Sequence, residues 1–350
     1  MFQKSKWIRL PRNVLVGHGV IEQVGDAVSD LHLSGRPLIV TSPTPHDVVG
    51  SRVSDQLADA DPETVVIEEA SFESVLEVSD VAAEVDAGYL IGIGGGKAID
   101  VAKMASDERD IGFLSVPTAA SHDGIVSGRA SIPDEDTRHS VAADPPLAVV
   151  ADTEILADAP WRLTTAGCAD IISNYTAVRD WQLAHRLKNV EYSEYPGALS
   201  QMTAEMLVEN ADSIKPGLEE SAWIVVKALV SSGVAMSIAG SSRPASGAEH
   251  LFSHQLDRLA PGAALHGHQV GVGSIMTEYL HSGAKGRWGQ MRDALAAIDA
   301  PTTAKGLDVD EELVIEALTT AHEIRDRYTI LGDGVSEDAA REAATVTGVI

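Results

Sequence analysis

The chain is nearly without cysteine: Cys168 is the only one among 350 residues, so no disulfide can form within it. Cys168 lies between Gly167 and Ala169, a setting that favours an inert, buried helix position over a reactive thiol. No stretch reaches the roughly 18 consecutive apolar residues of a membrane helix, and residues 1–20 lack the apolar core of a signal peptide. We therefore expect a cytoplasmic protein with no integral membrane association.

Basic residues are also scarce. Lys and Arg number 26 against 52 Asp and Glu, which leaves a formal net charge of −26. Such a surface repels nucleic acid and anionic lipid, so neither is expected as a partner. The acidic residues are spread along the chain and are not confined to a tail. This distribution predicts a host cytosol of high salt, where screening makes dense negative charge tolerable.

The first 160 residues alternate short apolar runs with helical patterns, which favours a parallel sheet covered by helices. The predicted strands are residues 14–17, 37–42, 64–67, 89–93, 113–116 and 147–151. Helical stretches between them include residues 19–29, 48–58 and 75–85. Within residues 132–140, the acidic run Asp134-Glu135-Asp136 predicts a hairpin turn or an exposed loop.

Beyond residue 160, strand-like runs nearly vanish and long helical patterns take over. The predicted helices are residues 165–187, 198–213, 219–239, 247–259, 267–282, 288–298, 311–327 and 336–347. We therefore predict two domains. Residues 1–160 form a dinucleotide-binding α/β domain with a Rossmann-like parallel sheet, and residues 161–350 form an all-α domain that binds metal and substrate.

A glycine loop, Gly94-Gly95-Gly96-Lys97, separates the strand at 89–93 from a helix at 98–106. Such a unit lets the backbone approach a phosphate and aims a helix N-terminus at it. Asp100, in the first helical turn, would stabilise the helix or contact a cofactor. The loop matches neither the G-x-G-x-x-G fingerprint nor the P-loop. Spacing alone thus predicts a phosphate ligand and leaves a tight turn without a ligand as the alternative.

A second polar loop follows the next strand. Residues 116–124 place Thr118 and Ser121 beside the pair His122-Asp123. Loops at the carboxyl ends of parallel strands are where ligands bind in such sheets. An ordinary capped turn is the alternative interpretation.

The helical half contains a candidate metal set. Asp170 lies in an apolar helix start, where a carboxylate is costly unless it is paired or binds a metal. His250 and His254 share one helical face at i, i+4, and His266 and His268 open another helix. Catalytic zinc needs about three protein ligands and one open position. Chemistry leaves the choice among the four histidines open, with solvated or core histidines as the alternative. His250 and His254 are the default pair, although the Glu of an H-E-x-x-H site is missing.

Together these residues resemble the iron- and zinc-dependent polyol dehydrogenases, which include glycerol dehydrogenase. Within that superfamily they are most similar to the archaeal sn-glycerol-1-phosphate dehydrogenases. The similar stretches span nearly the whole chain: residues 10–14, 17–19, 94–100, 117–124, 247–254, 265–271, 325–331 and 347–350.

The resemblance implies one catalytic zinc per subunit, bound by Asp170, His250 and His266. His254 then lines the substrate pocket, which replaces the default zinc pair. Asp123, Asp170 and His254 are the implied catalytic and substrate-contacting residues, and His268 stays outside the metal's ligands. The implied cofactor-binding residues are Gly94, Gly95, Gly96, Lys97, Ala98, Ile99, Asp100, Thr118, Ala119, Ala120, Ser121 and Ser127.

The implied reaction is the reversible reduction of dihydroxyacetone phosphate to sn-glycerol 1-phosphate, the backbone of archaeal membrane lipids. We expect both NAD and NADP to serve, because no acidic residue follows the strand at 37–42 early enough to exclude a 2′-phosphate. The resemblance also implies a homo-oligomer. The substrate phosphate needs cationic donors, and Arg129, Arg243, Arg258 and Lys305 are available without a ranking.

Three other functions fit parts of the pattern. A glycerol or other polyol dehydrogenase would use an unphosphorylated substrate. A relative of the dehydroquinate synthases would eliminate phosphate and regenerate its NAD in each cycle. A non-catalytic metal or nucleotide sensor would have no need for both the glycine loop and the full Asp and His set.

Overall fold

A six-stranded sheet forms the first part of the computed structural model, which describes residues 7–134 and 137–350. The strand order is β1-β8-β5-β4-β2-β3, and all neighbouring strands are parallel. The strands are β1 (Asn13–Gly17), β2 (Arg36–Thr41), β3 (Glu63–Val66), β4 (Ala87–Gly94), β5 (Gly112–Pro117) and β8 (Ala148–Asp152). Each strand matches a predicted one with small shifts at its ends, and the predicted α/β fold class is confirmed.

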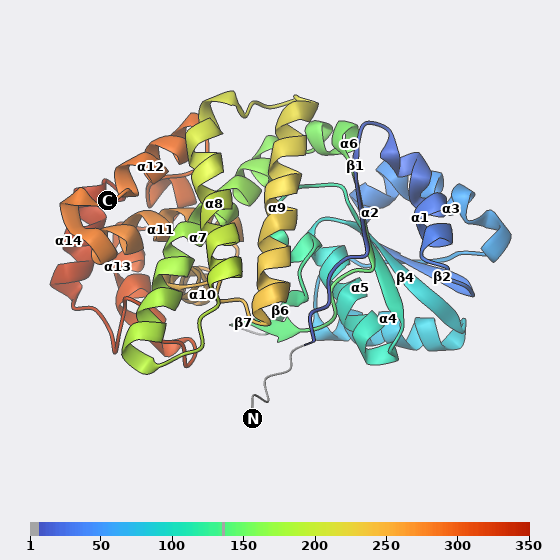
Figure 1. The fold of residues 1–350 in the computed structure, drawn as a ribbon, viewed down its shortest axis with the longest axis horizontal. Helices are drawn as coiled ribbons and strands as arrows, with labels where there is room; N and C mark the ends of the chain where they lie inside the picture. Colours follow the sequence, from blue (N-terminus) through green and yellow to red (C-terminus); the bar gives the residue numbers. More distant parts are fainter. Residues whose placement is uncertain (1–6, 135–136) are drawn as a thin grey trace.

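The sheet is buried on both faces because its strands alternate between two apolar clusters. In β2, Leu38 and Val40 belong to one cluster and Ile39 to the other. The first cluster contains α4 (Phe72–Glu84) and α5 (Gly96–Arg109), and the second contains α1 (Val24–Asp30) and α3 (Ser51–Gln56). Figure 1 shows these helices around the strands. Burial on both faces explains why the strands read as continuous apolar runs.

Shorter elements complete this part of the chain. They are α2 (Pro43–Pro45), α6 (Thr153–Asp158) and single turns at Val20–Gln23, His46–Gly50, Ala58–Ala60 and Asp123–Ile125. An antiparallel pair, β6 (Arg129–Asp134) and β7 (Thr137–Ala142), follows β5 and stands apart from the main sheet. The predicted turn or loop lies between these two strands, and its residues Glu135 and Asp136 fall outside the described residues.

The rest of the chain is helical (Figure 1). The helices are α7 (Trp161–Lys188), α8 (Glu194–Asn210), α9 (Glu219–Ala239), α10 (Ala248–Leu259), α11 (His266–Ser282), α12 (Trp288–Ala297), α13 (Glu311–Thr320) and α14 (Glu337–Thr347). Single turns lie at Ala211–Ser213, Gly283–Lys285, Lys305–Leu307 and Ala321–Glu323. The predicted division at residue 160 falls between α6 and α7. That it separates two domains stays a prediction.

One predicted helix is shorter than expected. The pattern at 311–327 predicts a continuous helix, but α13 ends at Thr320 and a short turn follows. Beyond it, Arg325 and Arg327 bond to Ser246 and Ser242, which lie just before α10. These tertiary bonds take the place of further helical turns.

Helix α9 is the one helix of the described chain that is long and apolar enough to cross a membrane. The most apolar window of this helix is 56% buried. It packs against α8, α7 and α6, as the core helix of a soluble protein does. Its composition therefore reflects packing inside the helical region.

Candidate active site

A cavity of about 880 Å³ lies between the carboxyl edge of the sheet and the helical region. It is within the size range of typical small-molecule sites. The predicted site residues that line it are Gly95, Gly96, Lys97, Asp100, Ala119, Ser121, Asp123, Ser127, Asp170, His250, His254 and His266. Five predicted cofactor residues are not part of the wall: Gly94, Ala98, Ile99, Thr118 and Ala120.

The three glycines of the loop occupy positions with different structural requirements. Gly94 ends β4 at φ 147°, a conformation that side chains oppose. A Cβ on Gly96 would lie 1.9 Å from Nε2 of His122, so the two residues pack in direct contact. A Cβ on Gly95 would meet no atom within 4 Å. Gly95 is also the N-cap of α5, and no side chain caps that helix. The loop thus presents unoccupied backbone donors of a helix N-terminus to the cavity.

Asp100 has structural partners. Its two oxygens accept hydrogen bonds at 3.0 Å from Nζ of Lys103 and from the backbone N of Ser131. Lys103 is fully buried and also donates to the carbonyl oxygens of Gly124 and Arg129. The pair ties α5 to the loop after β5 and to β6. A cofactor contact by Asp100 stays a prediction.

Three residues of the helical region form a group suited to a metal ion. One ligand atom from each of Asp170, His250 and His266 lies within 4.8 Å of the other two. Oδ1 of Asp170 is 3.6 Å from Nε2 of His250, and the two imidazole rings are 5.1 Å apart. A carboxylate oxygen with two imidazole nitrogens is a donor set typical of catalytic zinc. Their role as ligands stays a prediction.

Two glycines allow these elements to meet. A Cβ on Gly167 of α7 would lie 2.0 Å from the carbonyl oxygen of Ala120. A Cβ on Gly267 of α11 would lie 2.0 Å from the carbonyl oxygen of Ala166. The absence of these side chains lets α7 contact both the loop after β5 and the start of α11. This close packing brings Asp170 next to His266.

Buried partners hold the outer nitrogen of each histidine. Nδ1 of His250 is 2.9 Å from Oε1 of Glu249, a carboxylate that also accepts a hydrogen bond from Thr176. Burial alone would raise the pKa of Glu249, but bonds from His250 and the backbone N of Gly247 lower it. The ionised carboxylate therefore favours a proton on Nδ1 of His250 and leaves Nε2 facing Asp170.

The ring of His266 is held in the same way by hydrogen bonds through two uncharged side chains, Ser253 and Gln269. Its Nδ1 is 2.9 Å from Oγ of Ser253, which donates to Oε1 of Gln269 at 2.6 Å. Nε2 of Gln269 in turn donates to Asp257 at 2.9 Å. Because the hydroxyl proton of Ser253 is used by Gln269, its oxygen accepts from His266. The order of donors assigns the proton to Nδ1 and leaves Nε2 for a metal.

Asp123 and Asp170 meet at the floor of the cavity. The backbone N of Asp123 donates to Oδ2 of Asp170 at 3.2 Å, and Ser232 donates to Oδ2 of Asp123 at 2.7 Å. Burial raises the pKa of both carboxyls, and for Asp170 the charge of Asp123 raises it further. Two desolvated carboxylates side by side are costly without a cation, which agrees with a metal at this place.

The structure places His254, His268 and Cys168 in different surroundings. His254 lines the cavity, and its ring lies 5.7 Å from that of His266. Nε2 of His268 instead bonds Oγ1 of Thr165 at 2.9 Å, and burial lowers the pKa of His268 to about 4. Burial raises the pKa of the Cys168 thiol to about 12, in keeping with an inert core position.

No role was predicted for two side chains that line the cavity. Arg325 reaches it from the segment after α13, whereas the predicted phosphate donors Arg243, Arg258 and Lys305 are not part of its wall. Glu69, a few residues after β3, also lines it. The signal for both is tertiary, since only the packing of distant segments brings them to this edge.

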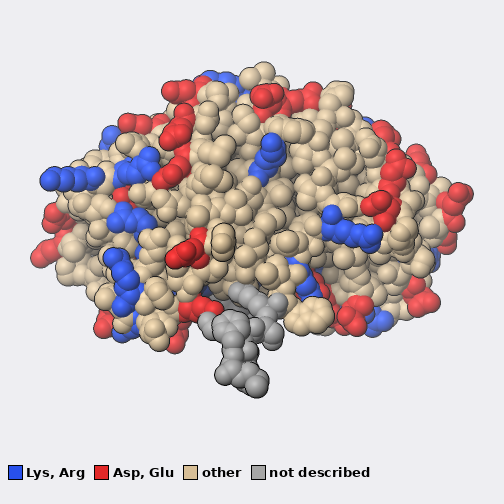
Figure 2. All heavy atoms as spheres, in the orientation of Figure 1, with Lys and Arg blue, Asp and Glu red and all other residues tan. Residues whose placement is uncertain are grey.

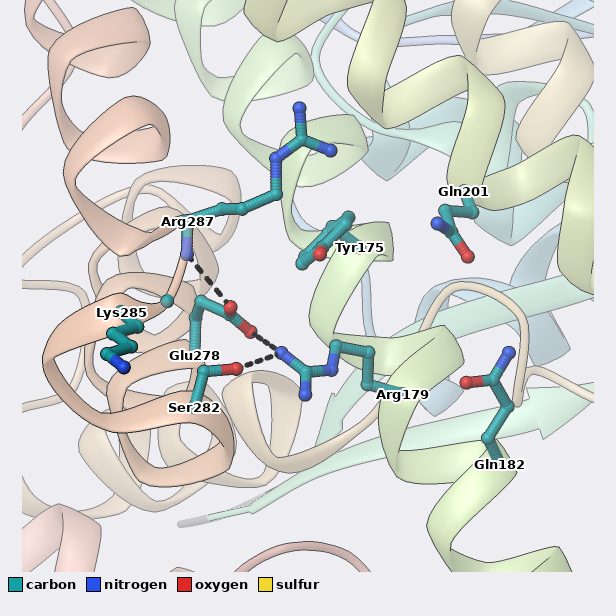
Figure 3. Close-up of a pocket in the computed structure, with 9 residues that line it drawn as sticks. Tyr175, Arg179, Gln182, Gln201, Glu278, Ser282, Lys285 and Arg287 are labelled. Carbon is teal, nitrogen blue, oxygen red and sulfur yellow. Dashed lines mark hydrogen bonds and ion pairs between the residues drawn. The ribbon is translucent and has the colours of Figure 1, made fainter.

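A smaller cavity of about 370 Å³ lies in the helical region, away from these residues. In Figure 3, Arg179 bonds Glu278 at 2.5 Å and also bonds Ser282. The guanidinium of Arg287 bonds Glu205 at 2.8 Å. Both arginines therefore have carboxylate partners within the fold.

Comparison with known proteins gives consistent results. The model of the iron-containing alcohol dehydrogenase family matches residues 15–160. A glycerol-1-phosphate dehydrogenase (NAD(P)+) of Haloarcula marismortui is 77% identical over 352 residues, which cover 100% of both chains. One of Methanosarcina mazei is 58% identical and covers 99% of this chain and 97% of its own.

Solved structures show the same fold at lower identity. A probable glycerol dehydrogenase from Sinorhizobium meliloti superposes with a TM-score of 0.82 at 20% identity, over 98% of each chain. The glycerol dehydrogenase from Schizosaccharomyces pombe gives 0.81 at 17% identity, over 99% of this chain and 92% of its own. The shared fold thus extends over nearly the whole of this chain.

Proposed function

The chain belongs to the glycerol-1-phosphate dehydrogenases of the iron-containing alcohol dehydrogenase family, and we propose that it reversibly reduces dihydroxyacetone phosphate to sn-glycerol 1-phosphate with NADH or NADPH. The observation that carries this proposal is 77% identity over the full chain to a protein of that activity. The product would serve as the glycerol backbone of archaeal membrane lipids. Relatives that are 77% and 71% identical are haloarchaeal, which agrees with the net charge of −26.

The metal that we propose is one zinc ion per subunit, bound by Asp170, His250 and His266. The donor set fits zinc, and the hydrogen bonds that both imidazoles donate to Glu249 and Ser253 already orient the rings for it. When bound, zinc supplies Lewis-acid polarisation of the ketone oxygen. The nature of the donors and the two raised carboxyl pKa values support this choice.

The protein's own groups then position the reactants. The N-terminus of α5, from Gly95 to Lys97, would hold the cofactor pyrophosphate. Hydride passes from the dihydronicotinamide to the carbonyl carbon, and the new alkoxide takes up one proton. Asp123 and His254 line the same cavity, and either could relay that proton. Burial raises the pKa of Asp123, and Ser232 occupies its Oδ2, so Oδ1 is the atom on which it would carry a proton.

The decisive experiment compares dihydroxyacetone phosphate with dihydroxyacetone in one preparation whose metal content has been measured. We expect one zinc per subunit and a clear preference for the phosphate ester. Equal or better turnover of the unphosphorylated ketone would favour the polyol dehydrogenase alternative. Substituting Asp170→Ala should remove the zinc and reduce the rate by a factor on the order of 100 or more. Full activity in that variant would refute the metal assignment.

We also propose a cytoplasmic homo-oligomer. Helix α8 exposes Tyr195, Met202 and Met206, which are 86%, 52% and 56% accessible. Their spacing of seven and four residues places them on one face of the helix, and large exposed apolar side chains are common in subunit interfaces. Light scattering on the purified protein would measure the number of subunits.

A further inference from the structure

Four arginines gather at one end of the cavity, and we call them the arginine cluster: Arg129, Arg243, Arg325 and Arg327. Arg129 and Arg325 are part of the cavity wall. Nη2 of Arg325 donates to Oγ of Ser246 at 2.7 Å, and Nη2 of Arg327 donates to Oγ of Ser242 at 2.9 Å. Neutral hydroxyls therefore hold the guanidinium groups in place without cancelling their charge.

The members of the arginine cluster form no direct ion pair with another described residue. Within residues 7–134 and 137–350, no carboxylate forms an ion pair with any of its members. Burial and the neighbouring guanidinium groups lower the pKa of Arg325 and Arg327. The charge of Glu249 raises the pKa of Arg325 and Arg327, but this carboxylate is already bonded to His250. Asp180 and Asp326 act in the same way on Arg243, and Asp180 is already bonded to His281. In a chain with 52 acidic and 26 basic residues, such a group of cations is costly and calls for an anionic ligand.

The cavity of Figure 3 provides the contrast within the same molecule. There Arg179 and Arg287 are neutralised by Glu278 and Glu205. In the smaller cavity the arginines thus have carboxylate partners, whereas the arginines at the end of the large cavity that adjoins His250 have none in a direct ion pair within the described chain.

Arg325 also has an unused donor. Its Nε is buried and has no hydrogen-bond partner in the described part of the chain. Because this Nε is shielded from the cavity, a ligand would be contacted by the Nη atoms of Arg325, which keep donor hydrogens beyond the one bonded to Ser246.

We propose that the arginine cluster, with Ser242 and Ser246, is the seat for the phosphate group of the substrate. This inference rests on the proposed function and deepens it by assigning the residues that distinguish dihydroxyacetone phosphate from dihydroxyacetone. Ser246 precedes His250 by four residues in the chain, and both line the cavity. The seat and the metal group thus lie side by side, so one small substrate can reach both. Arg129 and Arg325 contact the phosphate, while Arg243 and Arg327 add to the positive potential behind them.

The test compares Arg325→Met and Arg129→Met with the unaltered enzyme, and uses Arg287→Met as the matched control from the other cavity. The measured quantity is the ratio of kcat/KM for dihydroxyacetone phosphate to that for dihydroxyacetone. We expect this ratio to fall roughly 10- to 100-fold in each seat variant, the value of a hydrogen bond to a charged group. Inorganic phosphate, tested as a competitor of dihydroxyacetone phosphate, should inhibit the seat variants with a correspondingly higher inhibition constant. The control should match the unaltered enzyme in both measurements.

The outcomes separate this proposal from the proposed function. If the unaltered enzyme shows no preference for the phosphate ester, the proposed function itself fails. If it shows the preference and both seat variants keep it, or lose both activities in equal proportion, the seat is wrong and the function stands. Arg129→Met decides the matter if Arg325→Met does not fold, because the Arg129 guanidinium makes no hydrogen bond within the described chain.

Discussion

Oε1 of Glu249 lies 2.9 Å from Nδ1 of His250, so a fully buried carboxylate holds the ring whose other nitrogen faces Asp170. The two residues are neighbours in the chain, but the contact depends on the start of α10. There the backbone N of Gly247 and the hydroxyl of Thr176 hold the carboxylate. An anionic partner orients the imidazole and makes it a stronger metal ligand.

From this contact we predict that Glu249→Gln weakens zinc binding roughly 10- to 100-fold. The substitution keeps the shape of the side chain but removes the charge that polarises His250. Equilibrium competition with a chelator measures the affinity without relying on activity. Glu205→Gln is the control, because Glu205 pairs with Arg287 in the other cavity and should leave the affinity unchanged. An unaltered affinity in Glu249→Gln would show that Glu249 has only a structural role.

A second prediction concerns the glycine loop. Gly95→Ala should leave the stability nearly unchanged, because its φ of −85° suits alanine and the new Cβ would meet no atom within 4 Å. The same Cβ would occupy the space through which a pyrophosphate approaches the backbone. We expect the affinity for NADH to fall about tenfold or more, as measured by fluorescence titration. Gly289→Ala, in α12 with equally open surroundings, should bind NADH normally. Normal binding by Gly95→Ala would remove the loop from the cofactor site.

The sequence predicts the sheet well because its strands are buried on both faces and read as uninterrupted apolar runs. The proposed metal ligands were harder to identify from the sequence. The spacing within α10 makes His250 and His254 equally good candidates for metal ligands. Only the packing of α11 brings His266 next to both: its ring centroid lies 5.1 Å from that of His250 and 5.7 Å from that of His254. The resemblance to a family, and not the spacing, distinguished them. The residue pattern within one helix does not indicate which other helix supplies a metal ligand.

Residues from distant segments were out of reach for the same reason. Glu69 and Ser42 line the same cavity, and the strands that they follow, β3 and β2, are paired, so an acidic side chain reaches this edge from the neighbouring strand. The expectation that no acidic residue is near considered only the residues directly after β2. Arg325 was overlooked because the pattern at 311–327 extends α13, whereas bonds to Ser246 draw Arg325 to the cavity. In both cases a tertiary contact overrode the local pattern.

The pair His18 and Glu219 gives a pH prediction. Nδ1 of His18 lies 3.0 Å from Oε1 of Glu219, and this hydrogen bond raises the pKa of the exposed imidazole. A raised pKa means that the bond stabilises the fold below the unfolded value of about 6.5. The stabilisation is lost as the pH rises through the folded pKa. Glu219 bonds Thr153 and His18, which lowers its own pKa, so it stays charged throughout this range.

We therefore expect Glu219→Gln to lower the free energy of unfolding by more at a pH of about 6 than at about 8.5. Urea unfolding at both pH values measures the difference. In the same variant, the pKa of His18 followed by NMR should return toward about 6.5. A loss of stability that is the same at both pH values would mean that the bond to Thr153, and not the imidazolium, accounts for the effect.

The last prediction concerns salt. Acidic side chains lie along the upper edge and at both ends of the face in Figure 2, and the net charge is −26. At about 0.1 M salt the Debye length is about 10 Å, which leaves neighbouring carboxylates to repel one another, whereas at 1 M it is about 3 Å. Self-repulsion destabilises the compact state. We expect Tm to fall by roughly 10 °C or more between molar and 0.1 M KCl, on the order of several kcal/mol. Sucrose of equal osmolality should restore Tm only in part, because a neutral solute stabilises the compact state by its exclusion from the surface but does not screen charge. Full stability in dilute buffer would contradict the predicted adaptation to a salty cytosol.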